Sequence, residues 1–590
     1  MPYRAPVSDI LFAMRHAAGL PQVIEAHNGQ GGELDADFVG SIVEEAGKFA
    51  TDRIAPSNTV GDRNGAKLGP DGVKTAPGWS EIYRDWVAGG WNGVAADPEF
   101  GGMGLPVLVQ SACNEMWSAA NMAFSLCPLL TAGAVEAVSA HASDELKQTF
   151  LHKMVSGEWT GTMNLTEPQA GSDLNAVRSR AERAGDGTYR IFGQKIFITY
   201  GDHDMTDNIV HLVLARLPDA PPGTRGISLF LVPKFLVNAD GSLGARNDAR
   251  VHSIEHKMGI HASPTCTMVF GDKDGAVGYL VGQENRGLAC MFTMMNNARL
   301  GVGLQGVALA EAAYQHALAY AQDRKQGRAP GETGEGMSPI IRHGDVRRML
   351  ATMKGLTQAS RAICYLVAAS LDLAHTAKDE TTRKAMNERA SLLTPVAKAF
   401  STDIGSQVAA LGVQVHGGMG FIEETGAAQF MRDAKIAEIY EGTNGIQSID
   451  LVQRKLPLSG GETVKAEIAD MRDTLGLLRR SNEPAFGKTA QRLTEAVDSL
   501  ERATQFLLRP GVDQDTMQSA ATSYLRLFGL TRGGVSLAGA ALAAKDDASR
   551  PERIATARFV AENLAVASGG LESVVTEGAD SLASADLLSA

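Results

Sequence analysis

Apolar residues recur at helical spacing near the start of the chain and through most of its second half. The segment ADFVGSIVEEAGKFATDRIAP, residues 36–56, repeats apolar positions at intervals of three and four, which is the period of an amphipathic helix. Long patterns of the same kind cover residues 300–323, 345–367, 384–411 and 427–440. Four such helices can enclose one core, so the sequence predicts a helical bundle.

A different pattern fills the region after residue 161. Short segments rich in β-branched and aromatic residues, separated by Gly, Pro, Asn or Asp, are typical of strands. They lie at residues 187–201, 208–217, 226–233 and 266–272. Since no helical stretch of crossover length separates them, we expect an antiparallel sheet or barrel.

The predicted fold class is therefore α+β and mostly α, with an antiparallel β domain between two helical parts. The segment LPLSGGETV, residues 456–464, reads as a linker, and the Ala- and Leu-rich remainder indicates a further helical domain. The predicted divisions are an N-terminal extension (1–40), a helical domain (41–160), a β domain (161–285), a helical bundle (286–456) and a C-terminal helical domain (465–590).

Composition narrows the class of protein. The chain has 590 residues, of which 44% are hydrophobic, and a formal charge of -12, which argues against a nucleic-acid partner. Its five cysteines form no C-x-x-C pair, so we expect free thiols in a reducing compartment. Nothing indicates a metal site. Without a secretory pattern at the start or an uninterrupted apolar run of membrane length, we expect a cytoplasmic protein with no membrane partner.

One motif matches a cofactor-binding fingerprint but lies in the wrong structural context for it. GVGLQG, residues 301–306, matches the G-x-G-x-x-G dinucleotide fingerprint letter for letter. That fingerprint requires a preceding strand and a βαβ unit, whereas helical patterns surround this match. We interpret the glycines as sites of close helix packing.

Three other motifs suggest chemistry. MNLTEPQAGSDL, residues 163–174, places hydroxyls and backbone N–H groups on a loop, although such a loop can also be an ordinary turn at the end of a strand. GQKIFITYG follows at residues 193–201. In IAEIYEGTNGIQ, residues 436–447, a single carboxylate, Glu441, stands where a helical pattern meets a run of turn formers.

Together with QVHGGMG (414–420), MRDAKI (431–436), PEFGGMGLP (98–106) and ENRGL (284–288), these motifs resemble the acyl-CoA dehydrogenase family of flavoproteins. The resemblance covers about residues 40 to 455. It implies FAD as cofactor, bound between the β domain and the bundle. The cofactor contacts that it implies are Leu165, Thr166, Ser172, Phe197, Ile198, Thr199, Arg324, His343, Gln414, Val415, Gly417, Gly418, Thr443 and Asn444.

The resemblance also assigns a role to Glu441. In the family, the corresponding glutamate is the base that removes the α-proton of an acyl-CoA thioester while the β-carbon gives hydride to the flavin. Burial beside an acyl chain is expected to raise its pKa. Substrate contacts are implied for Ser172, Asn296, Arg299 and Gly442, with Gly442 leaving room for close approach. Phe197 departs from the tryptophan of most members, which keeps a ring but loses the indole N–H.

The residues added after the bundle and the N-terminal extension resemble a long bacterial branch of the family. This branch includes an enzyme whose substrate is a short acyl-CoA with a thioether sulfur beyond the β-carbon. The Met-rich stretch MFTMM, residues 291–295, is compatible with contacts to such a sulfur, but plain core filling is the commoner use of methionine. A short-, medium- or long-chain fatty acyl-CoA dehydrogenase, an acyl-CoA oxidase on the same fold, and a helical scaffold protein without activity stay as alternatives.

The resemblance implies partners as well. The expected electron acceptor is an electron-transfer flavoprotein. Because the adenine half of FAD crosses a subunit boundary in this family, we also expect at least a homodimer. A very-long-chain member uses its helical appendix to attach to membranes, but here residues 465–590 show no basic amphipathic stripe.

Overall fold

The computed structural model describes residues 3–333 and 335–583, and contacts divide the chain into two compact units. Unit 1 comprises the described residues of 1–48, 106–119 and 299–590. Unit 2 comprises residues 49–105 and 120–298.

The helices and strands follow one another as the sequence predicts, helical first, then β, then helical again. The helices are α1 (Val7–Phe12), α2 (Leu20–Asn28), α3 (Ala36–Phe49), α4 (Ser57–Asn64), α5 (Trp79–Ala88), α6 (Val107–Ala120), α7 (Met122–His141), α8 (Asp144–Ser156), α9 (Gly287–Asp323), α10 (Gly344–Thr376), α11 (Glu380–His416), α12 (Ala427–Ala434), α13 (Asn444–Asp450), α14 (Glu462–Ser481), α15 (Thr489–Leu507), α16 (Gln514–Ala543), α17 (Arg550–Phe559), α18 (Ser568–Glu577) and α19 (Ala579–Ala583). The strands are β1 (Lys67–Gly69), β2 (Gly72–Lys74), β3 (Trp159–Asn164), β4 (Arg180–Arg183), β5 (Tyr189–Thr199), β6 (Asn208–Arg216), β7 (Ile227–Pro233), β8 (Phe235–Val237), β9 (Leu243–Arg246), β10 (Ala249–Ile254), β11 (Thr265–Phe270) and β12 (Ala276–Val281).

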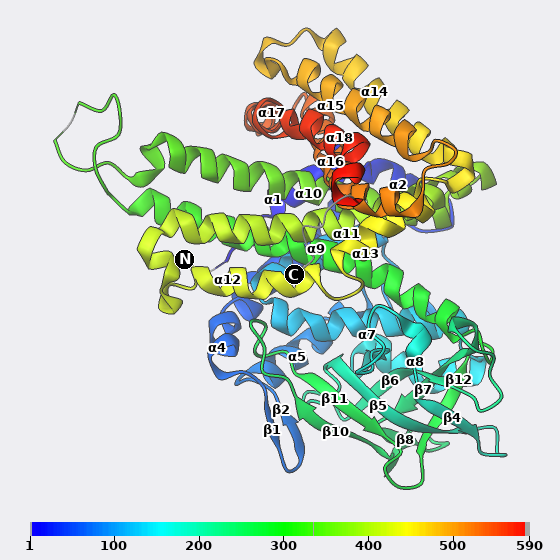
Figure 1. Cartoon of the computed structure of the whole chain (residues 1–590). Helices are drawn as coiled ribbons and strands as arrows, with labels where there is room; N and C mark the ends of the chain where they lie inside the picture. Colours follow the sequence, from blue (N-terminus) through cyan, green and yellow to red (C-terminus); the bar gives the residue numbers. More distant parts are fainter. Residues whose placement is uncertain (1–2, 334, 584–590) are drawn as a thin grey trace. The chain divides into compact units, whose positions relative to one another are not determined.

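Unit 2 is built on an eight-stranded sheet (Figure 1). Its strand order is β10-β11-β5-β12-β7-β6-β3, with β4 pairing both β5 and β6. The four strands predicted from the sequence are β5, β6, β7 and β11. The antiparallel prediction is right for most pairs but wrong for two. Strand β3 pairs with β6 in parallel from Trp159 opposite Asn208 to Asn164 opposite Val213, and β4 pairs with β6 in parallel at one position. The local sequence of β3 does not indicate which strand it pairs with, because β6 lies far along the chain.

Helix α7 covers one face of β3. A Cβ atom added at Gly161 would come within 2.4 Å of the Ala134 side chain, so this glycine lets the helix approach the strand. Among the described residues, α7 is long and apolar enough to cross a membrane by length and composition. The sequence expectation of no such segment considered only uninterrupted apolar runs, and polar residues interrupt this helix. However, 78% of its most apolar window is buried inside the protein, as in an ordinary core helix.

In unit 1, helices α9, α10 and α11 run side by side as the centre of the bundle (Figure 1). The glycines of GVGLQG lie within α9. A Cβ atom at Gly306 would lie 2.3 Å from the Ser401 carbonyl oxygen of α11, and one at Gly303 would lie 2.7 Å from the Ala397 carbonyl oxygen. The interpretation of this motif as close helix packing is confirmed.

A buried ionic cluster joins the helices of unit 1. The Arg361 guanidinium in α10 donates to Glu115 Oε1 at 2.6 Å and to Glu311 Oε2 at 2.9 Å, and the Tyr365 hydroxyl donates to Glu115 Oε2 at 2.7 Å. Arg361 and Glu115 are each 1% exposed. Breaking such a pair from one side leaves an uncompensated buried charge, so the cluster fixes how α6, α9 and α10 pack.

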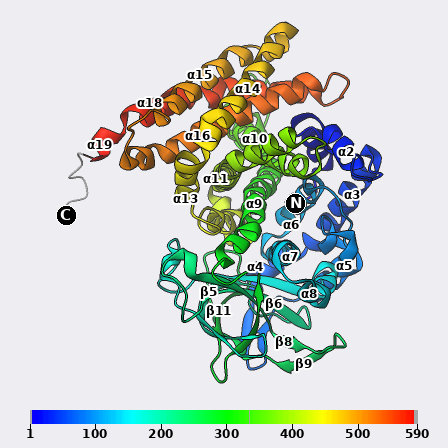
Figure 2. The ribbon, with the colours of Figure 1, turned by 90° about the vertical axis from the view of Figure 1, so that its right-hand side faces the viewer.

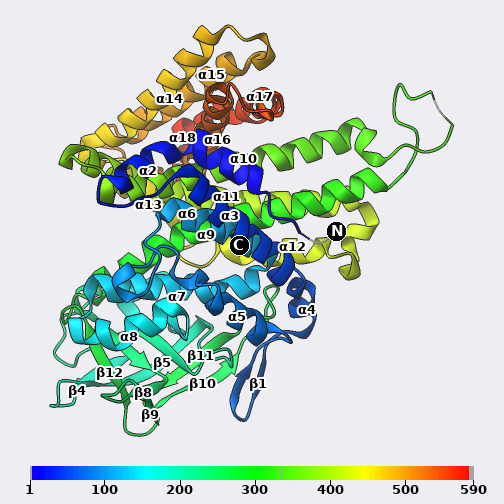
Figure 3. The same ribbon diagram turned by 180° about the vertical axis from the view of Figure 1, so that it is seen from behind.

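The C-terminal helices from α14 onward form a further layer, in which α16 contacts α17 and α18 and also α10 of the bundle (Figure 2). The chain enters this layer through Ser459, Gly460 and Gly461, all with positive φ, directly before α14. The N-terminal helices pack against the bundle, since α2 contacts α10 (Figure 3).

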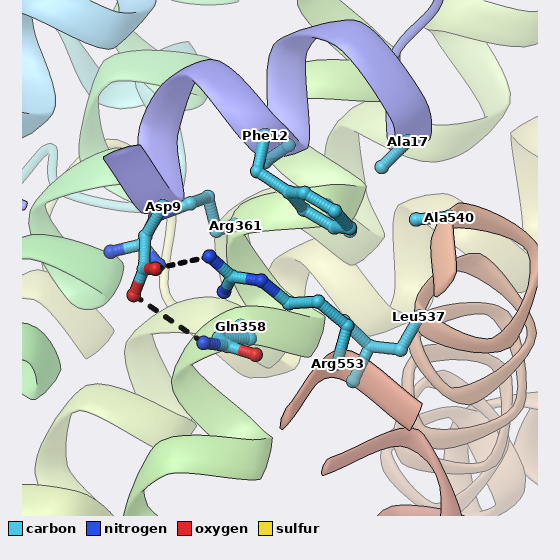
Figure 4. Close-up of a pocket in the computed structure, with 10 residues that line it drawn as sticks. Asp9, Phe12, Ala17, Gln358, Arg361, Leu537, Ala540 and Arg553 are labelled. Carbon is cyan, nitrogen blue, oxygen red and sulfur yellow. Dashed lines mark hydrogen bonds and ion pairs between the residues drawn. The ribbon is translucent and has the colours of Figure 1, made fainter. Parts of the chain in front are cut away.

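A small cavity marks the contact of the N-terminal segment with this layer (Figure 4). Asp9 Oδ1 accepts from Arg553 at 2.5 Å, and the Arg553 guanidinium stacks 4.3 Å from the Phe12 ring centroid. The cavity holds about 20 Å³, room for about one water molecule. It is therefore too small to receive an acyl-CoA or a flavin.

Candidate active site

Glu441 stands at a tight reversal of the chain in unit 1. The helical segment after α12 ends as the Tyr440 N–H donates to the Ile436 carbonyl at 3.1 Å. Glu441 then adopts φ +54°, and Gly442 adopts φ +83°. A left-handed conformation at a non-glycine residue costs about 1–2 kcal/mol and is typical of functional sites, where surrounding contacts hold it.

Contacts with α13 hold this reversal. The Gln447 side-chain amide, which is fully buried, donates to the Glu441 carbonyl at 3.1 Å. A Cβ atom at Gly442 would lie 2.7 Å from the same Gln447 nitrogen. The glycine after the glutamate is thus required by the chain itself, in addition to any requirement of a substrate.

The two predicted cofactor contacts that follow, Thr443 and Asn444, build the turn. The Thr443 hydroxyl caps α13 by accepting from the Ile446 N–H at 3.2 Å. The Asn444 side chain donates to Asp403 Oδ1 at 2.7 Å and accepts from Lys398 Nζ at 2.8 Å. The side-chain groups of both residues are therefore engaged within unit 1.

The surroundings of the Glu441 carboxylate disfavour its charge. Burial raises the pKa of Glu441 from 4.5 to about 7, and the nearby cations Arg299 and Lys398 only partly oppose this effect. The Arg299 Nε atom is buried and has no hydrogen-bond partner in the described residues. A carboxylate whose pKa is raised toward neutral pH, near a guanidinium whose Nε lacks a partner among the described residues, can act as a general base next to a carbonyl-bearing ligand.

The predicted contacts to the adenine half of the cofactor fall into two groups. Arg324 and His343 are brought together by Gln326, whose side-chain oxygen accepts from Arg324 at 3.3 Å and whose carbonyl contacts His343 Nε2 at 2.8 Å. Arg324 is exposed, whereas His343 is half-buried. The loop between α9 and α10 thus presents two polar side chains to the outside of unit 1.

The second group lies at the end of α11. Gln414, Gly417 and Gly418 are exposed, whereas Val415 is buried, with 4% of its surface accessible. Gly417 has φ +60°, and an added Cβ would meet nothing within 4 Å at either glycine. This open backbone can approach a ligand closely, whereas the Val415 side chain points into the protein.

In unit 2, a buried ion pair shapes the predicted flavin loop. Glu167 Oε1 accepts from Lys195 Nζ at 2.8 Å, and the Glu167 carboxylate also accepts from the Arg178 N–H at 2.8 Å. The same ammonium donates to the Leu165 carbonyl at 2.9 Å. Burial alone would raise the pKa of Glu167, but Lys195 and the hydrogen bonds outweigh it and lower that pKa to about 2.

The other unit 2 residues predicted to contact the cofactor lie on and beside β5. Thr166 accepts from the Ile196 N–H at 2.9 Å, which ties the loop to the strand. Phe197 has φ +59° and 59% of its surface is exposed, and Thr199 is half-buried. An exposed aromatic ring held by a strained backbone at the end of a strand fits the edge of a planar cofactor such as a flavin.

Two predicted contacts depart from this surface. The Ile198 side chain is 2% exposed and belongs to the hydrophobic core of the sheet, because side chains alternate along a strand. Only its backbone is available to a cofactor. Ser172 lies on the exposed loop after β3.

The substrate predictions have mixed placement. The side chain of Asn296 lies outside the described residues. Met291 and Met294 are fully buried in the core of unit 2, and Met295 packs against that core. Core filling is therefore confirmed as the use of the Met291 and Met294 side chains.

Sequence reasoning missed two buried cations, one in each unit. Lys398 interrupts an apolar run of α11, from Leu392 to Phe400, and is fully buried. Lys195 lies inside the GQKIFIT motif and is also fully buried. In both cases a lysine at a position where the pattern calls for an apolar side chain was the available signal.

Models of protein families cover nearly the whole chain. The acyl-CoA dehydrogenase N-terminal domain matches residues 40–158, the middle domain residues 162–273 and the C-terminal domain residues 285–456. A fourth model, described as acetyl-CoA dehydrogenase C-terminal like, matches residues 463–586.

Individual relatives agree with these models. The 3-methylmercaptopropionyl-CoA dehydrogenase of Ruegeria pomeroyi is 46% identical over 597 residues, covering 100% of both chains. A butyryl-CoA dehydrogenase of Syntrophomonas wolfei is 36% identical over 95% of both chains. Among solved structures, an acyl-CoA dehydrogenase from Bacillus anthracis complexed with FAD has a TM-score of 0.74 at 20% identity, over 93% of this chain and 89% of that one. This last likeness bears on the fold alone.

Proposed function

The chain belongs to the acyl-CoA dehydrogenase family of FAD-dependent oxidoreductases, and from this premise we propose that it oxidises the Cα–Cβ bond of a short acyl-CoA thioester. The observation that carries the proposal is the Glu441 turn. The backbone of Glu441 is held there in a left-handed conformation, and burial raises the pKa of its carboxyl group to about 7.

The reaction needs one base. Glu441 removes the α-proton of the thioester, and a proton therefore ends on the Glu441 carboxylate. When bound, FAD supplies the acceptor for the hydride that leaves the β-carbon, so that a carbon–carbon double bond forms. Because the ionised form of Glu441 is the base, its raised pKa places the onset of activity near neutral pH, where a general base is most effective.

The residues present fit FAD in both units. In unit 2 the backbone of the Leu165–Thr166 loop and the exposed Phe197 ring would hold the flavin. In unit 1 the exposed Arg324 side chain and the open backbone of Gly417 would hold the adenine half. Arg299, with its unsatisfied Nε, would contact the thioester or CoA portion of the substrate.

The proposed substrate is 3-methylmercaptopropionyl-CoA, and the product would be methylthioacryloyl-CoA, as in the degradation of dimethylsulfoniopropionate. The support is the 46% identity over the full length to an enzyme of that name. The methylthio substrate has a sulfur next to the β-carbon, so its product is a conjugated vinyl sulfide. Butyryl-CoA is the comparison, because its β-carbon bears a methyl group in place of the methylthio group and because a 36% identical relative carries its name.

The proposed assembly is a cytoplasmic homodimer that passes electrons to an electron-transfer flavoprotein. The support for association is a group of exposed apolar side chains in the segment that follows α11. Met419 is 49% exposed, Phe421 is 87% exposed and Ile422 is 45% exposed. Apolar side chains gathered on a surface usually mark a contact with another chain, and molecular mass in solution by light scattering tests this point.

The activity is tested by anaerobic reduction of the bound flavin with a panel of acyl-CoA thioesters, including the methylthio and butyryl compounds. We expect loss of the yellow colour with short substrates, at a rate that rises as pH increases through about 7. Glu441→Gln should retain the colour and lose at least about 10³-fold in rate, within the range of about 10²–10⁴-fold that a general base contributes. Glu438→Gln, three residues earlier, is the matched control and should reduce normally.

Two results would contradict the proposal. An unimpaired Glu441→Gln variant would place the base elsewhere. A colourless protein that takes up no FAD would favour a scaffold without activity. Release of hydrogen peroxide at the full turnover rate in air would instead identify an acyl-CoA oxidase on the same fold.

A further inference from the structure

A buried lysine lies beneath the turn that carries Glu441. Lys398 stands on α11 within a run of buried residues and is 0% exposed. Its Nζ donates to Asn444 Oδ1 at 2.8 Å. Burying an ammonium group with only a neutral amide oxygen as acceptor destabilises the folded protein. A lysine kept at such a position is therefore a candidate for a functional role.

Asn444 links this ammonium to the turn. Besides accepting from Lys398, Asn444 accepts from the Thr402 hydroxyl at 3.2 Å and donates to Asp403 Oδ1 at 2.7 Å. Asn444 begins α13, only three residues after Glu441. Side chains of α11 therefore hold Asn444 by hydrogen bonds, and this restrains the backbone of the turn that carries Glu441.

Lys398 also faces Glu441 electrostatically. The charged groups around its ammonium are Glu441, Asp403, Arg299 and Glu438. Burial lowers the pKa of Lys398 to about 8, and Glu441 is the carboxylate that opposes this most. In return, Lys398 and Arg299 favour the ionised form of Glu441, which is the form that removes a proton.

We infer that Lys398 is a positioning residue of the proposed reaction: its ammonium, tethered to Asn444, fixes the turn of Glu441 and keeps a positive charge beside the base. The inference rests on the proposed function. Lys398 touches neither substrate nor cofactor in this scheme and acts through Asn444 and Glu441. The predicted signature is therefore a displaced pH dependence together with a slower reaction.

The experiment compares Lys398→Met with wild type by anaerobic flavin reduction, per bound flavin, between pH 6 and 8. Loss of the ammonium should move the half-maximal pH upward by about one unit, on the scale of shifts that a neighbouring charge causes. With a midpoint moved from about 7 to about 8, the rate at pH 7 falls about fivefold. Lys398→Arg keeps the positive charge and should restore the wild-type midpoint.

A matched control removes a different lysine that contacts the same helix. Lys455 donates to the Ser391 hydroxyl of α11 at 3.0 Å, and Glu441 is not among the groups that influence its pKa. Lys455→Met should leave both the midpoint and the rate per bound flavin unchanged. An equal displacement in Lys455→Met would overturn the specific link between Lys398 and Glu441.

Asn444→Ala separates the tether from the charge and replaces Lys398→Met should that variant fail to fold. With the ammonium present but untethered, we expect a rate at least about tenfold lower at every pH and an unchanged midpoint. Wild-type rates in Asn444→Ala, or a Lys398→Met variant that loses only FAD content and thermal stability, would overturn the inference. A wild-type protein that no acyl-CoA reduces would instead refute the proposed function.

Discussion

The raised pKa of Glu441 predicts that neutralising this side chain stabilises the protein, and only above a certain pH. Its pKa is 4.5 in an exposed chain and about 7 in the folded protein. Between these values the folded state binds more protons than the unfolded state, so the stability of wild type falls as pH rises from about 4.5 to about 7 and then stays level. Glu441→Gln has no charge to bury and escapes this loss.

The magnitude follows from the displacement. Each pH unit corresponds to about 1.36 kcal/mol, so a change from 4.5 to about 7 gives roughly 3 kcal/mol at high pH. This value already includes the attraction of Arg299 and Lys398. Since the side chain is only half-buried, solvent screening reduces the expected gain to about 1–3 kcal/mol.

Thermal unfolding midpoints measure this gain, because a chain of two units need not unfold in one step. Both proteins are compared at pH 4.5 and pH 8.5 with the same excess of FAD. We expect Glu441→Gln to unfold about 2–12 °C above wild type at pH 8.5, on the scale of 2–4 °C per kcal/mol for large domains. At pH 4.5 the two should agree.

The control is Glu438→Gln, which removes the partner of Lys435 on the same segment. It should gain nothing at pH 8.5 relative to pH 4.5. If Glu441→Gln gained as much at pH 4.5 as at pH 8.5, the stabilisation would come from packing, and the reasoning from a buried charge would be refuted. An unchanged midpoint at both pH values would show that the carboxylate is well solvated.

Two further substitutions test the frame around the site. Lys195→Met leaves the Glu167 carboxylate buried without its cation, so we expect the free energy of unfolding to fall by about 3–5 kcal/mol and FAD to be retained less well. Adding Glu167→Gln should partly recover both. A thermal unfolding midpoint equal to that of wild type would show that the pair is not needed. Gly306→Val places a Cβ 2.3 Å from the Ser401 carbonyl oxygen and should destabilise the protein by at least about 1–3 kcal/mol, seen as a lower thermal unfolding midpoint. Gly344→Ala is the control, because open space surrounds that position, and it should leave the midpoint unchanged. Equal midpoints for the two variants would contradict the close contact of α9 with α11.

Much of the fold was predictable from local pattern. The helical period gave α9, α10 and α11, and runs of β-branched residues gave β5, β6, β7 and β11. These signals are local, because the residues of one helix or strand are near neighbours in the chain. The parallel pairing of β3 with β6 was not predictable in this way, since partners such as Trp159 and Asn208 are far apart in sequence.

The candidate site divides along the same line. The turn formers after Glu441 indicated that the chain reverses there, and the motif pointed to this carboxylate as the base. The apolar neighbours of Lys398 in α11 could signal that this lysine is buried, but its position beneath Glu441 was not visible, because it depends on how α11 packs against the turn. Likewise, the contact that excludes a side chain at Gly442 comes from Gln447, whose place depends on how α13 packs.

The amino-acid sequence by itself determined the order of helices and strands, the reversal at Glu441 and the family of the protein. These depend on period, on turn chemistry and on short motifs, all of which act between near neighbours. Only the tertiary structure decided which groups surround the Glu441 carboxylate and therefore how readily it ionises. The physical reason is that a pKa depends on the removal of water and on charges in space, such as Lys398, which lies on another helix.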